Sequence, residues 1–318
     1  MRAPFPGYAR FAWATLLFTL FVILWGAFVR ASGSGAGCGS HWPLCNGEVV
    51  PHSPAWATAI EFGHRLTSGV SLFLVVGLWW SARSRFERSA PVRRAAGWSL
   101  FFMLTEALIG AGLVLFEYVA DDARIARGFW VAAHLLNTFL LVAMLTACAA
   151  WASGLERPRL AGRSGLIAML GAAAVGLLLL GVSGAITALG DTLFPAETYA
   201  EAKAATFSET AHLFVRLRIW HPTMALVVGA LVLGAAISAW ANRPTARVQA
   251  AARAVVALYA IELLVGLVNV WWLAPVPVQL IHLLLADLIW IALVWMSLAS
   301  VADEEGASGN DVGVVSQA

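Results

Sequence analysis

Four histidines lie at corresponding places in four separate apolar stretches of the chain. They are His64, His134, His221 and His282, each a few residues inside a stretch long enough to cross a membrane. A single histidine in a membrane helix most often hydrogen-bonds to a neighbouring helix. Four at matching positions favour haem, because imidazole is a good ligand for haem iron and a four-helix bundle can enclose a flat macrocycle. Zinc or copper would more typically require further Cys, His or carboxylate ligands at one point.

One of these histidines has an acidic neighbour that its counterpart lacks. Glu61 precedes His64 by three residues, whereas Arg218 occupies the matching place before His221. Residues three apart lie on neighbouring parts of one helix face. The carboxylate could simply offset the helix dipole, but it also suits a site that handles protons or a cationic intermediate. The asymmetry predicts a reacting haem in the N-terminal half and an electron-transfer haem in the C-terminal half.

Arginines lie close to the same histidines. Arg65 follows His64, and Arg216 and Arg218 precede His221 by five and three residues. Haem carries two propionates, and the planar guanidinium of arginine pairs well with carboxylates. The alternative is interfacial snorkelling, in which the charged head simply reaches water. Three acids lie deeper in the apolar stretches and remain open between haem-ligand partner, proton relay and structural hydrogen bond: Glu106, Glu262 and Asp287.

Apolar helices must position these residues. Of the 318 residues, 60% are hydrophobic and 12% charged, about half the roughly 25% charged residues usual in soluble domains. This composition excludes an ordinary soluble enzyme, and the net charge of +2 gives no indication of a nucleic-acid partner. Runs of about 20 apolar residues predict an all-α integral membrane protein with eight transmembrane helices, near 11–30, 57–80, 96–118, 128–150, 165–188, 213–240, 254–273 and 278–300.

The sequence contains an internal repeat. Gly26–Val29 resembles Gly184–Thr187, and a Glu-x-x-x-Gly step occurs at both Glu106 and Glu262. The repeat predicts two pseudo-symmetric four-helix bundles, residues 1–155 and 160–300, followed by a cytoplasmic tail, 301–318. Four helices per half insert in the same sense, so the axis relating the halves runs along the membrane normal.

Charge sets the expected orientation. Most of the 20 basic residues fall on the side of the N-terminus, so the positive-inside rule places both termini in the cytoplasm. The four histidines then lie roughly 6–12 Å below the outer boundary. The first apolar run, which has a counterpart in the repeat, is long for a signal peptide, and this favours a retained helix.

The expected outer loop between the first two helices contains two cysteines, Cys38 and Cys45. An oxidising compartment allows them to form a disulfide that staples a Gly-rich loop. A redox-active pair is the other interpretation, although the six-residue spacer differs from the Cys-x-x-Cys spacing of oxidoreductases. Cys148, by contrast, is expected to be a small apolar core residue. For His41, His52 and His212 we expect solvated or hydrogen-bonded side chains.

Three motifs together resemble the haem A synthase family. They are Gly33–Cys38 in the outer loop, His41–Gly47 after it, and Glu61–Arg65 in the second helix. The resemblance extends through His134, His221 and His282 and so covers essentially all eight helices.

The resemblance implies an oxidoreductase of the cell inner (plasma) membrane that converts haem O to haem A for terminal oxidases. It oxidises the C8 methyl group to a formyl group through an alcohol. The implied roles are haem b binding by His221, His282 and Arg216; substrate haem binding by His64, His134 and Arg65; catalysis by Glu61; and a Cys38–Cys45 disulfide. The implied partners are haem O synthase, terminal oxidase assembly factors and membrane lipid, and a homo-oligomer is left open.

The chain departs from the family in one loop. Some members carry a second cysteine pair between the fifth and sixth helices, whereas residues 189–212 contain no cysteine. A relay that depends on two disulfides is therefore in doubt. Two alternative functions remain: a dihaem b-type transmembrane electron carrier, which predicts haem sites at two depths rather than one, and a haem-binding assembly chaperone.

Overall fold

The chain folds into long helices, eight of which are long and apolar enough to cross a membrane. The computed structural model describes residues 5–52 and 55–303, and that part contains no strand. The eight spans are α1 (Pro6–Ala31), α2 (Trp56–Arg85), α3 (Pro91–Leu115), α4 (Ile125–Ala152), α5 (Ser164–Leu193), Leu213–Asn242, α9 (Ala246–Trp271) and α10 (Val276–Val301). The prediction of an all-α membrane protein with eight helices is confirmed.

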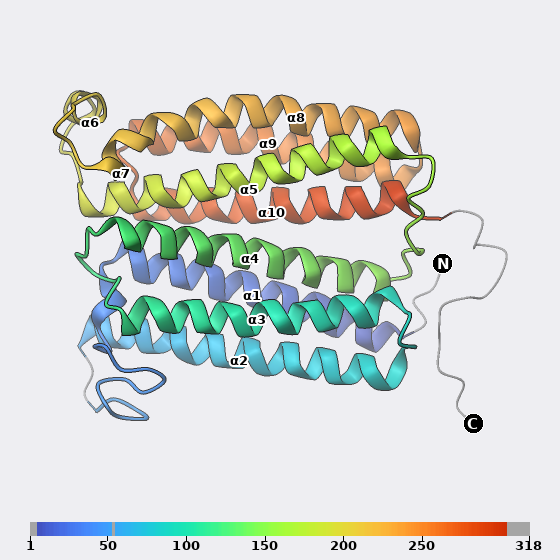
Figure 1. Cartoon of the computed structure of the whole chain (residues 1–318), viewed down its shortest axis with the longest axis horizontal. Coiled ribbons are helices and arrows are strands. Elements are labelled where there is room, and N and C mark those ends of the chain that lie inside the picture. Colours follow the sequence, from blue (N-terminus) through green and yellow to red (C-terminus); the bar gives the residue numbers. More distant parts are fainter. Residues whose placement is uncertain (1–4, 53–54, 304–318) are drawn as a thin grey trace.

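Shorter elements lie between the spans. The sixth span consists of α7 (Leu213–Arg216), the 3-10 turn η2 (Leu217–Ile219) and α8 (Trp220–Asn242). Another 3-10 turn, η1 (Ser34–Ala36), follows α1, and α6 (Tyr199–Thr206) precedes α7. We call the end of the molecule that carries residues 32–52 and 194–212 the loop end. In Figure 1 it lies on the left, and α1 begins and α10 ends on the right.

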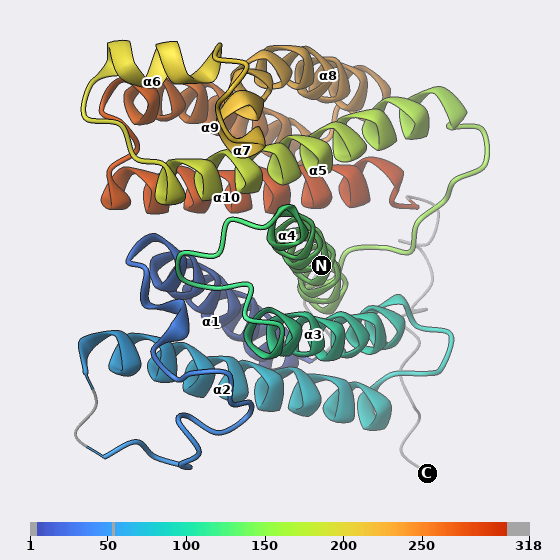
Figure 2. The ribbon, with the colours of Figure 1, turned by 60° about the vertical axis from the view of Figure 1, so that its left-hand side comes forward.

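The helices pack as two groups. Helices α1, α2, α3 and α4 contact one another, as do α5, α8, α9 and α10. Contacts between the groups run from α4 to α5 and α10, and from α1 to α10. Figure 2 shows α4 between α3 and the α5–α10 pair, with α2 far from the second group. Each group therefore carries two of the four histidines.

Several helices begin earlier than the apolar runs predict. The predicted range 96–118 corresponds to α3, which begins at Pro91, and the range 254–273 to α9, which begins at Ala246. Proline fits the first turn of a helix, where its missing N–H needs no partner. The Thr245 side chain accepts a hydrogen bond from the Val248 N–H and caps α9. Polar first turns therefore extend these helices beyond their apolar parts.

Tightly buried residues concentrate in the half of each group away from the loop end. Ala12, Ala96 and Ala149 are completely buried there, and small residues let membrane helices approach closely. Cys148 is also fully buried, with its sulfur 3.4 Å from the Tyr8 hydroxyl, so its prediction as a core residue is confirmed. The four histidines lie nearer the loop end, where their rings are only partly buried.

Candidate haem sites and the disulfide loop

Each of the four histidine rings lies against a glycine of a neighbouring helix. A Cβ added to the glycine would approach the ring Cε1 atom to 2.8 Å for Gly26 and His64, 2.9 Å for Gly184 and His221, 3.2 Å for Gly266 and His282, and 3.6 Å for Gly110 and His134. At the first two positions a side chain would overlap the ring, so glycine is required for close approach. The same helix-to-helix contact thus occurs in both groups.

The C-terminal histidines face each other. The ring centroids of His221 and His282 are 6.1 Å apart, and their planes are nearly perpendicular, at 87°. Bonds from imidazole nitrogen to a metal are about 2 Å long. The spacing of the two rings therefore fits a single metal ion between them, as in a haem with two axial histidines.

Neighbouring groups fix which nitrogen of each C-terminal histidine is free. The Ser183 hydroxyl donates to the Leu180 carbonyl, so it accepts from Nδ1 of His221 at 3.0 Å. Nδ1 of His282 lies 3.0 Å from a carboxylate oxygen of Glu262. The hydrogen bond to Ser183 places the ring proton of His221 on Nδ1. For His282 the adjacent carboxylate favours the same tautomer, although the contact does not have hydrogen-bond geometry. The Nε2 lone pair of each ring is then left for a metal. The donor set of this pair therefore fits haem.

The N-terminal pair is arranged differently. Nδ1 of His134 lies 3.2 Å from Oε1 of Glu106. Two side chains of α4 donate to that carboxylate, Asn137 at 2.5 Å and Thr138. Within the described residues, Nδ1 of His64 is buried with neither a hydrogen-bond partner nor a carboxylate at ion-pair distance, whereas Nδ1 of His134, which also has no hydrogen bond, lies beside Glu106. Nor does a ring contact like that of the C-terminal pair join His64 to His134 within the described chain.

The structure distinguishes the three deep acids. Glu106 and Glu262 lie at matching places, each beside Nδ1 of a histidine, which is a contact that orients metal-binding imidazoles. Asp287 is completely buried, and neither carboxyl oxygen has a hydrogen-bond partner among residues 5–52 and 55–303. Sequence reasoning left these roles open because the contacts join different helices.

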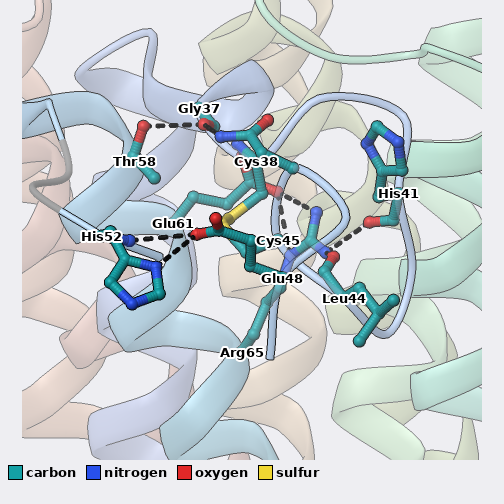
Figure 3. The surroundings of a disulfide bond; sticks show 11 residues. Gly37, Cys38, His41, Leu44, Cys45, Glu48, His52, Thr58, Glu61 and Arg65 are labelled. Atoms are coloured by element: carbon teal, nitrogen blue, oxygen red, sulfur yellow. Dashed lines mark hydrogen bonds and ion pairs between the residues drawn. A yellow bond between two sulfur atoms is a disulfide. The ribbon is translucent and has the colours of Figure 1, made fainter. Parts of the chain in front are cut away.

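Glu61 lies next to the disulfide loop and is almost completely buried, at 3% exposure. One carboxylate oxygen accepts the Cys38 N–H at 2.8 Å. The other accepts from Nε of Arg65 at 3.1 Å and also from its Nη2. Figure 3 shows the carboxylate between the Arg65 side chain and the loop. The Glu61 side chain is therefore held in one position by three donors.

Arg65 joins the loop to α2. Its Nη1 donates to the carbonyls of His41 and Leu44, at 2.5 and 2.7 Å. Both carbonyls belong to the segment that the cysteines enclose (Figure 3). The ion pair with Glu61 could be predicted from their spacing of four residues along a helix. The carbonyl contacts could not, because they depend on the fold of the loop. The predicted binding of a propionate by Arg65 stays a prediction.

The Cys38–Cys45 disulfide is formed, and both cysteines are buried. Gly37 lets the loop approach the first turn of α2, because an added Cβ would lie 2.5 Å from the Ala57 carbonyl. The Thr58 hydroxyl donates to the Gly37 carbonyl at 2.7 Å. The disulfide loop is thus packed directly on the helix that carries Glu61 and His64.

The other predicted arginines and histidines lie as follows. Arg216 is exposed, and its side chain has no hydrogen-bond or ion-pair partner in the described part of the chain. Arg218 is held by α5, with its Nε 2.7 Å from an Asp191 oxygen. His52 hydrogen-bonds with Glu48, and His212 caps α7. His41 is exposed in the disulfide loop.

Comparisons with known proteins identify the family. A family model described as "Cytochrome oxidase assembly protein" (COX15-CtaA) matches residues 9–294. A Thermus thermophilus protein named protoheme IX farnesyltransferase is 46% identical over 307 residues, which are 96% of this chain and 50% of that protein. A heme A synthase of Alkalihalophilus pseudofirmus is 35% identical over 134 residues, 41% of this chain and 43% of that protein. Another, from Shouchella clausii, is 41% identical over 111 residues, covering 35% and 36%.

The matches to single proteins and the match to the family model differ in how much of each sequence they cover. The chain spans about half the length of the Thermus relative and is aligned over less than half of the two heme A synthases. The family model, however, covers all eight helices except the first turn of α1 and the last turns of α10. The chain therefore belongs to the COX15-CtaA family of cytochrome oxidase assembly proteins.

Proposed function

We propose that this chain is a haem A synthase, which oxidises the C8 methyl group of haem O to a formyl group through an alcohol. The observation that carries the proposal is the chemical difference between two matching histidine sites. Both groups of helices place their histidines against glycines, but only the N-terminal group has a buried carboxylate three residues before one of them, at Glu61. Relatives named heme A synthase support the same reaction.

In this proposal the C-terminal pair, His221 and His282, holds a resident haem b. The facing rings and the contacts on their Nδ1 atoms support this assignment. Haem b, when bound, takes up and passes on single electrons. Arg216 is the proposed partner of a propionate, because it is a cation near His221 without a protein partner in the described chain.

The N-terminal pair, His64 and His134, faces the substrate haem O. Glu61 accepts hydrogen bonds from Arg65 and from the Cys38 amide, so its carboxylate is fixed in place before the reaction starts. A fixed carboxylate can take up a proton released by the methyl group or stabilise positive charge next to the ring. Arg65 is proposed to keep Glu61 in place and to lie near a substrate propionate.

The proposed location is the plasma membrane, with both termini in the cytoplasm. The loop end then faces the outside, where a disulfide is stable. The proposed partners are the enzyme that makes haem O and the assembly factors of terminal oxidases. The Thermus relative supports the first partner, because its name denotes transfer of a farnesyl group to protohaem IX and it is twice as long as the aligned region.

Pigment analysis tests the proposed reaction. The full-length protein is expressed with haem O supplied, and the haems are extracted and separated by chromatography. We expect haem A from the wild type and from Glu48→Gln, which changes an exposed acid of the same loop. We expect at least a hundredfold less from Glu61→Gln, in line with the loss of a positioned proton-transfer group.

The pigments also separate the alternative functions. A folded wild type that contains haem b and leaves haem O unchanged would refute haem A synthesis and favour an electron carrier or a haem chaperone. Undiminished haem A in Glu61→Gln would refute the role given to Glu61.

A further inference from the structure

Arg30, the next-to-last residue of α1, extends its side chain into the other group of helices. Its Nη1 donates to the Ala188 carbonyl at 2.8 Å and to the Thr192 hydroxyl at 2.6 Å, both on α5. Its Nη2 donates to Oε1 of Gln279 on α10, at 2.9 Å. The Gln279 amide in turn donates to the Ala274 carbonyl at 2.5 Å, which fixes its orientation. One guanidinium thus joins three helices.

Few other side chains make such a connection. Among the described helices, the only other side-chain hydrogen bond from one group to the other runs from the Trp290 indole to the Phe139 carbonyl, at 2.7 Å. Trp290 lies about two turns beyond His282, away from the loop end. Arg30 therefore provides the polar connection between the two groups in the part of the molecule that extends from the histidines to the loop end.

The residues that Arg30 joins lie close to both histidine sites. Arg30 and two of its partners are each about one helical turn from a residue of a site. The spacings are Gly26 to Arg30, Gly184 to Ala188, and Gln279 to His282. Gly26 packs against His64, and Gly184 against His221. A shift of α1 against α5 and α10 would therefore move one site relative to the other.

The charge of Arg30 is not neutralised by a direct partner. All three of its acceptors are neutral oxygens, and Asp191, whose charge acts on Arg30 from a distance, forms its ion pair with Arg218. Charges interact over longer distances in a low-dielectric interior than in water. A fixed positive charge favours the reduced form of a nearby haem iron, because that form is less positive.

We infer that Arg30 is a positioning residue that fixes the two histidine sites relative to each other and raises the reduction potential of the haem at His221 and His282. The first part depends only on the contacts of this chain. The second rests on the proposed function.

Hydrogen exchange measured by mass spectrometry tests the first part. The full-length protein is compared in lipid nanodiscs as wild type, Arg30→Gln, Gln279→Leu and Arg124→Gln. Arg124 is an exposed arginine of the α3–α4 loop whose contacts stay within the first group, so it is the matched control. We expect exchange in residues 186–193 and 276–282 to be about tenfold faster in Arg30→Gln, the effect of losing charge-assisted hydrogen bonds. Gln279→Leu should affect 276–282 alone, and the control neither segment.

Redox titration of the resident haem tests the second part. Arg30→Gln is expected to have a lower midpoint potential than wild type, with a larger shift than Arg124→Gln. Arg30→Lys keeps the charge and should restore most of the potential, while exchange remains fast because a lysine cannot reach all three acceptors.

The two parts fail separately. Wild-type exchange in Arg30→Gln overturns the connection between the groups, whichever haem is bound. An unchanged midpoint potential in Arg30→Gln overturns the electrostatic role. A wild type without haem at His221 and His282 refutes the proposed function and with it the electrostatic part, but the exchange experiment still tests the connection.

Discussion

A polar group lies beside Nδ1 in three of the four histidines, as a hydrogen bond for His221 and as a carboxylate at ion-pair distance for His134 and His282. The Ser183 hydroxyl hydrogen-bonds to Nδ1 of His221, and the Glu262 carboxylate lies beside Nδ1 of His282. Glu106 lies beside His134 in the same way. A histidine whose Nδ1 is held by a protein group presents Nε2 in a fixed direction, and loss of such a partner typically weakens metal affinity by 10–100-fold. His64 lacks this constraint, since its buried Nδ1 has neither a hydrogen-bond partner nor an ion-pair partner in the described residues, and such a histidine suits a site whose ligand is exchanged.

The glycine opposite each ring gives the first prediction. Gly184→Ala should displace His221, because the new Cβ would lie 2.9 Å from the ring. We expect purified Gly184→Ala to contain at least tenfold less b-type haem than wild type. Gly171→Ala, in the same helix, is the control, because nothing lies within 4 Å of its new Cβ. Full haem content in Gly184→Ala would contradict the packing argument.

The pair of Glu48 and His52 predicts a pH dependence. The His52 backbone N–H and then its ring hydrogen-bond to the Glu48 carboxylate and lower the pKa of that group. Because the pKa of Glu48 is lower in the folded state, its ionised carboxylate stabilises this turn fully above the unfolded value of about 4.3. That stabilisation is lost as the pH falls through the folded pKa. The His52 amide should therefore lose its protection against hydrogen exchange in acid. The same profile in Glu48→Gln would show that Glu48 is not responsible.

Sequence patterns indicated which residues have counterparts in the two halves better than they indicated contacts. The repeated Glu-x-x-x-Gly step paired Glu106 with Glu262, which lie at matching places, and the four-residue spacing fits the ion pair of Glu61 and Arg65. The contacts of Arg65 with loop carbonyls could not be predicted from the sequence. They join residues more than 20 positions apart, and neither periodicity nor spacing specifies how a Gly-rich loop folds.

At the scale of elements, the disulfide loop, residues 32–52, packs against the start of α2. It is held by its own disulfide, by Arg65 and by the close approach at Gly37. Its apolar side chains remain exposed, with Trp42 at 42% and Val49 at 77%. A tryptophan at this level suits the membrane interface, where Trp and Tyr are enriched.

Removal of the disulfide gives an element-scale prediction. The double variant Cys38→Ser, Cys45→Ser should lose about 2–3 kcal/mol of stability, the value expected for a closed loop of this length. Because the Cys38 amide and two loop carbonyls position Glu61 and Arg65, haem A formation should fall while haem b content is kept. Chromatography and absorption spectra measure both. Equal loss of haem b would show that the loop supports the whole fold instead.

Helices were the most predictable elements, because about 20 apolar residues are needed to cross the bilayer and the chain contains eight such runs. The short helix α6 was not predicted, because it lies in a polar segment and begins with a Thr198 cap that stabilises only eight residues. The predicted range 213–240 includes α7, but not the 3-10 turn that separates α7 from α8. The start of α3 was also misplaced, because Pro91 and two arginines in its first turn interrupt the apolar run.

For the whole molecule, the two groups of helices and their loops define the orientation in the membrane. Arginines cluster at the end away from the loops, which predicts that this end faces the cytoplasm. In intact cells, an impermeant maleimide should label Glu209→Cys at the loop end and not Ser89→Cys between α2 and α3. Cys148 is buried and the other two cysteines are joined, so the background is low. The opposite labelling would reverse the orientation.

We propose above all that the two histidine pairs have different functions, with His221 and His282 holding the resident haem and His64 and His134 facing the substrate. Absorption spectra of the purified wild type, His64→Ala and His221→Ala test it most directly. We predict a b-type haem spectrum in the wild type and in His64→Ala, and its loss in His221→Ala. An unchanged b-type spectrum in His221→Ala, or its loss in His64→Ala alone, would contradict the account.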